Sequence, residues 1–92
     1  MKSHRVSRPA LEILTYFLRN PAAIDSLEGI AQWRLLEQAI LPTISETESA
    51  LKWLVDEGYL IEIERPLSPR LFQLNPEKNE TAGNLLRATR RE

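Results

Sequence analysis

The sequence predicts a small α+β domain in which three helices are followed by a two-stranded β-hairpin. Apolar residues recur at helical spacing in three consecutive segments, which is the pattern of helices that bury one face. Two short segments of alternating apolar and polar residues come next, as expected for strands with one buried face. A proline-containing tetrapeptide, residues 66–69, separates these segments and favours an antiparallel hairpin with a short loop.

Length and composition limit the class of protein. A chain of 92 residues forms one domain around one modest core. No apolar run approaches the roughly 20 residues that cross a bilayer. The basic N-terminus lacks the continuous apolar region of a secretory signal, so we expect a cytoplasmic protein. The chain contains no cysteine, which excludes disulfides, thiolate zinc sites and cysteine nucleophiles.

The first predicted helix covers residues 9–19. Ser7 is placed to cap its N-terminus, and Pro9 suits a first turn because the N–H group it lacks has no partner there. The helix is expected to end at Asn20, since the residue before Pro21 avoids the α conformation. Its apolar stripe consists of Leu11, Leu14, Phe17 and Leu18.

The second predicted helix covers residues 24–40. Asp25 and Glu28 have the spacing of a capping box at its start. Gly29 costs a helix about 1 kcal/mol relative to alanine, and close contact with another helix would explain it. After Trp33 the apolar positions spread around the whole helix, so either the helix breaks near residue 35 or it continues as a more buried helix.

The third predicted helix lies within the stretch SETESALKWLVDEGYL, residues 45–60. Both Thr43-x-x-Glu46 and Ser45-x-x-Glu48 match a capping box, so the helix begins in this window in either register. Gly58 is placed to end it in the left-handed conformation. At 100° per residue the apolar side is formed by Thr47, Ala50, Leu51, Leu54 and Val55.

Two strands and a polar tail complete the chain. Residues 59–65 and 70–75 are the predicted strands of the hairpin. The apolar members of their alternation are Ile61, Ile63, Phe72 and Leu74. We divide the chain into a flexible basic arm, residues 1–8, a folded domain, residues 9–75, and a tail, residues 76–92, that is either frayed or a short C-terminal helix.

The junction between the third helix and the first strand has a recognisable pattern, Leu51-x-x-Leu54-x-x-x-Gly58-Tyr59-Leu60-Ile61. It resembles the winged helix-turn-helix superfamily, in particular small bacterial MarR/PadR-like domains, over about residues 9–75. The resemblance implies a three-helix winged helix-turn-helix, with the third helix as the recognition helix and the hairpin as the wing. It also implies a DNA-binding transcriptional regulator, and these regulators commonly form homodimers.

Charge is distributed unevenly along the chain. Residues 21–64 hold two cations and nine carboxylates, whereas residues 1–20 hold four cations and one carboxylate. Residues 65–92 hold six cations and three carboxylates, so both ends are basic and the middle is acidic. Because phosphate contacts need cations, DNA contacts are expected from the ends and the wing together with short polar side chains of the third helix. The candidate nucleic-acid residues are Arg5, Arg8, Arg34, Thr43, Ser45, Ser49, Lys52, Arg65 and Arg70.

A protein-interaction adaptor that does not bind DNA is the main alternative. Trp53 lies far from the centre of the apolar stripe, and tryptophan is enriched at interface hot spots. It either packs against a neighbouring element or is an exposed anchor, and the same choice applies to Trp33. The candidate interface residues are Trp33, Trp53, Leu85 and Leu86, the last two as a possible dimer contact or part of a disordered tail.

Catalysis is not expected. The chain has one histidine, His4, in the basic arm, and lacks a Ser/His/Asp set, a metal-ligand cluster and a Gly-rich phosphate loop. We therefore predict a non-enzymatic binding module that needs no cofactor, no metal, no small-molecule ligand and no membrane. Duplex DNA is the leading partner, a protein is second and RNA is third.

Overall fold

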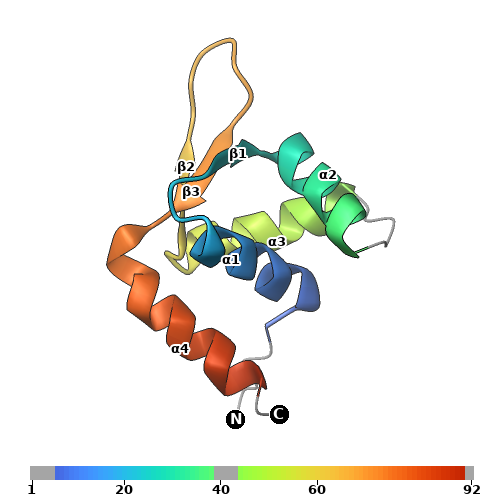
Figure 1. The fold of residues 1–92 in the computed structure, drawn as a ribbon. Coiled ribbons are helices and arrows are strands. Elements are labelled where there is room, and N and C mark those ends of the chain that lie inside the picture. The colour runs from blue at the N-terminus through green and yellow to red at the C-terminus, as the bar shows by residue number, and fades with distance from the viewer. Residues whose placement is uncertain (1–5, 39–43, 91–92) are drawn as a thin grey trace.

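The computed structural model describes residues 6–38 and 44–90. Figure 1 shows α1 and α3 in the centre, the β-hairpin standing away from them, and α4 along the other side of α1. The α+β class and the order of three helices followed by a hairpin agree with the sequence prediction. The elements in order are α1 Arg8–Arg19, β1 Ile24–Ser26, α2 Leu27–Gln38, α3 Ile44–Asp56, β2 Leu60–Ile63, β3 Leu71–Leu74, the 3-10 turn η1 Pro76–Lys78, and α4 Asn79–Arg90.

The first helix begins and ends as its sequence predicts. The Ser7 hydroxyl accepts a hydrogen bond from the Ala10 N–H at 3.2 Å, and Pro9 lies in the first turn. At the other end the Asn20 N–H donates to the Tyr16 carbonyl at 3.0 Å. These contacts satisfy backbone groups that helix termini otherwise leave without partners.

The start of the second predicted helix is wrong, because residues 24–26 form the strand β1. The cap of α2 is Ser26 rather than Asp25, since the Ser26 hydroxyl accepts from the Gly29 N–H at 3.2 Å. Asp25 instead accepts a hydrogen bond from the Tyr16 hydroxyl at 2.6 Å. A Cβ on Gly29 would lie 3.0 Å from Asp25 Oδ1, so this side chain, not a second helix, explains the glycine.

The sheet has three antiparallel strands in the order β1-β3-β2, one more than the predicted hairpin supplies. Leu60 pairs with Leu74 and Glu62 with Phe72, so these side chains share a face. Leu60, Phe72 and Leu74 are buried, whereas Ile61 is exposed. The predicted inward face of β3 is confirmed, but that of β2 is shifted by one residue.

The core lies where α1, α3 and the sheet meet. The buried stripe of α1 packs against α3, and Leu60 and Phe72 cover the same cluster from the sheet. The largest fully buried side chains are Phe17, Ile13, Leu14, Ile30, Leu51, Leu54 and Thr47.

The tail predicted as frayed or helical is helical from Asn79 to Arg90. Ala82 is fully buried, and Leu85 and Leu86 pack, partly buried, against the core of their own chain. Intramolecular packing thus accounts for this leucine pair without the second copy that the sequence suggested.

Gly58 ends α3 in the left-handed conformation, with φ of 87°, as predicted. The Tyr59 N–H donates to the Leu54 carbonyl at 2.9 Å, and the Gly58 N–H donates to the Val55 carbonyl at 3.0 Å. This pair of bonds is a Schellman motif. It turns the chain directly from α3 into β2 and so fixes the hairpin relative to the helix.

Candidate nucleic-acid interface

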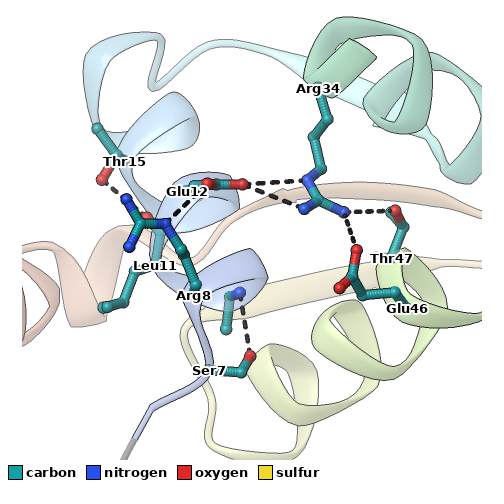
Figure 2. A network of polar contacts seen from close by, with 9 residues as sticks. Ser7, Arg8, Leu11, Glu12, Thr15, Arg34, Glu46 and Thr47 are labelled. Atoms are coloured by element: carbon teal, nitrogen blue, oxygen red, sulfur yellow. Dashed lines mark hydrogen bonds and ion pairs between the residues drawn. The ribbon is translucent and has the colours of Figure 1, made fainter. Parts of the chain in front are cut away.

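A buried arginine connects the three helices that would carry the interface. Arg34 of α2 donates from Nε and Nη2 to Glu12 Oε1 of α1, at 3.2 Å in both contacts (Figure 2). Its Nη1 donates to Glu46 Oε1 at 3.2 Å and to Thr47 Oγ1 at 3.0 Å, both on α3 (Figure 2). Four contacts from one planar group therefore hold the first turn of α3 against α1 and α2.

The prediction that Arg34 contacts nucleic acid is wrong. The residue is 4% exposed, and its guanidinium is occupied by Glu12, Glu46 and Thr47. A phosphate could reach it only after these partners were displaced, which would leave Glu12 largely buried with only the exposed Arg8 to offset its charge. Local sequence could not show this, because the partners lie 22, 12 and 13 residues away in the chain.

The outward side of α3 is a ridge formed by Ser45, Ser49, Lys52 and Asp56, all exposed. Their spacing of three and four residues places them along one line of the helix. Lys52 forms an exposed ion pair with Asp56 at 3.2 Å. The ridge therefore presents two short hydroxyl side chains near the start of α3 and a neutralised pair near its end.

One side of this ridge borders a cleft of about 510 Å³ between α3, the hairpin and the start of α2. Carboxylates outnumber cations four to two around it, a feature that the sequence analysis missed because the groups come from three segments. The charged residues that line the cleft are Glu28, Glu48, Lys52, Asp56, Glu62 and Arg70.

The other side of the ridge borders a hollow of about 380 Å³ between the start of α1 and α3. Ser7, Pro9, Ser49 and Trp53 are among the residues that line it. Arg8, between Ser7 and Pro9, has a side chain that is 86% exposed and pairs with Glu12 at 3.6 Å. A solvated cation thus lies beside the hollow at the N-terminus of α1.

The hairpin supplies two further cations. Seven residues, 64–70, connect β2 to β3, so the loop is longer than the predicted four-residue turn. Arg70 Nε lies 3.2 Å from Glu62 and 3.3 Å from Glu64. Arg65 is exposed and forms no ion pair within residues 6–38 and 44–90. Arg65 is therefore more available to a phosphate than Arg70.

Both tryptophans pack within the chain. The Trp53 ring stacks on Tyr59 with centroids 6.0 Å apart and planes at 27°. The Trp33 ring lies against Tyr16 with centroids 4.8 Å apart. Both tryptophan side chains are half-buried. Neither is therefore the exposed anchor that the adaptor alternative requires.

The structure places six of the nine predicted nucleic-acid residues at exposed positions on the α3 ridge, at the start of α1 or on the wing. Two others, Arg5 and Thr43, lie outside the described residues, and Arg34 is buried. The six are Arg8, Ser45, Ser49, Lys52, Arg65 and Arg70.

Comparison with known proteins supports the fold. The chain is similar to a ferric uptake regulator from Francisella tularensis, solved with iron, with a TM-score of 0.67 and 21% sequence identity. The match covers 82% of this chain and 58% of the regulator, so this chain spans little more than half the length of that protein. No protein-family model and no curated protein sequence matches the chain.

Within residues 6–38 and 44–90, no three His, Cys, Asp or Glu side chains are grouped as metal ligands. Among the helices described there, none is long and apolar enough to cross a membrane. The chain has the winged helix-turn-helix fold, with α3 as its third helix and the β2–β3 hairpin as its wing.

Proposed function

We propose that this chain is a DNA-binding transcriptional regulator that places the α3 ridge in the major groove. One observation carries the proposal: the polar ridge of α3 lies between two hollows, with an exposed arginine lining one and another in the chain segment that borders the other. Arg8 lies on one flank, and Arg65 and Arg70 lie on the wing at the other. In this fold the third helix presents its N-terminal residues to base edges.

The ridge suits the groove in size and chemistry. A major groove about 12 Å wide admits a helix, and serine hydroxyls exchange hydrogen bonds with bases or phosphates without holding the helix away. Ser45 and Ser49 are the base-reading candidates, and Lys52 is free to leave its exposed partner Asp56 for a phosphate or a guanine. Exposed pairs of this kind are worth only about 0–1 kcal/mol, so the exchange costs little.

The carboxylates of α3 lower the expected affinity for DNA, but they do not prevent the helix from entering the major groove. Glu46 is occupied by Arg34, which offsets its charge and directs it toward α2. Glu48 lies in the cleft beside the wing and approaches the phosphates with its full charge. We therefore expect weak non-specific affinity for duplex DNA, together with contacts between the ridge and a defined base sequence.

The matching structure is a ferric uptake regulator, so the finer likeness to MarR/PadR-like domains rests on residue pattern alone. A cytoplasmic, non-enzymatic protein that binds duplex DNA as a homodimer is consistent with this role. A DNA-independent adaptor is not proposed, because Trp33 and Trp53 are packed against Tyr16 and Tyr59.

Selection from a random duplex library tests the proposal. The purified chain should enrich a defined sequence, and Ser49→Ala should bind that sequence more weakly while binding random duplex as before. Arg87→Ala, on α4 and away from both hollows, serves as the control and should leave the preference intact. Failure to enrich any sequence from the library would contradict the proposed function.

A further inference from the structure

The tip of the wing is a tight turn with an unexpected residue in it. The Ser68 N–H donates to the Arg65 carbonyl at 3.3 Å, and Pro66 and Leu67 are the two central residues. Proline at the first central position and φ of 62° at the second are typical of a type II turn. The second central position normally holds glycine or asparagine, because a side chain there is strained.

Neither folding nor packing explains Leu67. Its side chain is fully exposed, and it is not among the hydrophobic residues that pack against the core. Leucine thus combines a strained backbone with an apolar surface in water, two features that both oppose stability. A residue that lowers the stability of its own loop is a candidate for a contact with something outside the chain.

The surroundings of Leu67 indicate what it contacts. The loop stands away from the body of the protein (Figure 1), so its tip can enter a narrow groove. Pro66 and Pro69 stiffen it, and Arg65 and Arg70 bracket it without any carboxylate between them. Pro69 and Arg70 also line the cleft beside α3, so the wing and the ridge share one side of the molecule.

We propose that Leu67 is an apolar wedge that enters the minor groove beside the site bound by α3 and partly unstacks a base step there. This inference rests on the proposed DNA-binding function. Leucine is one of the side chains that wedge between base pairs and kink a duplex. Arg65, next to the wedge and free of ion pairs among the described residues, is placed to follow the negative potential of a narrow minor groove.

A nucleic-acid groove fits this tip better than a lipid or protein surface does. One leucine between two arginines offers too little apolar area to anchor a bilayer, for which two strong signals are needed. Protein interfaces likewise need a cluster of buried anchors rather than one side chain. Wedging between bases needs only one side chain on a stiff support, which is what the turn supplies.

The test uses duplexes of the selected sequence that carry 2-aminopurine at successive positions beside the site. The wild type and Leu67→Met should raise 2-aminopurine fluorescence severalfold at one step. Leu67→Ala and Leu67→Gly should lose this signal and bind about tenfold more weakly, with the same salt dependence, because no charge is removed. Leu67→Gly should also melt at a higher temperature than the wild type, which shows that its loss of binding is not misfolding.

Three results separate the possible failures. If the wild type binds no duplex at all, the proposed function fails and the inference fails with it. If the wild type binds but Leu67→Gly gives the same fluorescence and affinity, the inference alone fails. Leu67-dependent retention on anionic phosphatidylglycerol vesicles, with no such dependence on duplex, would also overturn the wedge.

Discussion

Arg34 Nη1 lies 3.2 Å from Glu46 Oε1, and this contact fastens the first turn of α3 to the middle of α2. The same guanidinium contacts Glu12, whose side chain is 13% exposed, so two helices converge on one buried cation. The position of the α3 ridge relative to α1 therefore depends on this network. The contribution of this network to the free energy of unfolding can be measured separately from any binding activity.

Replacing Arg34 by methionine should destabilise the fold by about 3–5 kcal/mol, because Glu12 would remain largely buried with only the solvated Arg8, 3.6 Å away, to offset its charge. Urea unfolding at neutral pH measures the change. Glu46→Gln is the comparison, since Glu46 is 49% exposed and its loss should cost no more than about 1 kcal/mol. If the two substitutions lowered the free energy of unfolding equally, the burial of Glu12 would not explain the contribution of Arg34.

Two glycines should respond in opposite directions to alanine. Gly58 has φ of 87°, and a Cβ there would lie 3.3 Å from Lys78 Cε, so Gly58→Ala should cost about 1 kcal/mol or more. Gly83 lies within α4, where the nearest atom to an added Cβ is Arg87 Nη1 at 3.7 Å. Gly83→Ala should stabilise by about 0.5–1 kcal/mol. Thermal unfolding of both variants checks the pair, and a stabilising Gly58→Ala would refute the left-handed cap.

The Tyr16 hydroxyl makes the free energy of unfolding depend on pH in the alkaline range. Its hydrogen bond to Asp25, followed by burial and the negative charge of Asp25, raises the pKa of Tyr16 from 10.0 to about 12. The unfolded chain then loses this proton at lower pH than the folded chain, so the contribution is complete below pH 10.0 and is lost as pH rises toward about 12. Urea unfolding of the wild type and Tyr16→Phe should show a difference that shrinks over this range, whereas a constant difference would contradict the shift.

Glu48 should weaken DNA binding in the wild type. Removing its charge by Glu48→Gln should tighten binding to duplex by about fivefold, which corresponds to a repulsion on the order of 1 kcal/mol near the protein surface. Fluorescence anisotropy at low salt measures the change. Glu57→Gln removes the same charge from the end of α3, outside both hollows, and should have little effect. A larger effect from Glu57→Gln would place the nucleic acid elsewhere.

Hydrophobic periodicity and the residues that begin and end helices predicted most of the fold, because the helices depend on local signals. Ser7, Pro9 and Gly58 act within a few residues of themselves, and each lies where its pattern placed it. The strand β1 has only three residues and no alternation, and it forms because β3, almost fifty residues later, offers it a pairing edge. The inward face of β2 was ambiguous because Leu60, Ile61 and Ile63 supply apolar side chains to both faces.

The candidate site was less predictable because its decisive features are long-range. Arg34 looks like any exposed helical cation until Glu12 and Glu46 are brought to it by the fold. The acidic cleft likewise collects carboxylates from α2, α3 and β2. Leu67 could have been noticed from sequence, since a leucine follows proline where a tight turn favours glycine. Its full exposure required the structure.

The salt dependence of duplex binding reports whether cations beside the α3 ridge contact DNA phosphates. If cations on both flanks of the α3 ridge contact phosphates, the wild type should bind a duplex at about 50 mM salt, and Arg8→Ala with Arg65→Ala should lower the slope of log affinity against log salt by about 2. Arg19→Ala with Arg87→Ala removes the same charge away from both hollows and should leave the slope unchanged. No binding by the wild type at about 50 mM salt, or equal slopes for the two double variants, would contradict the account.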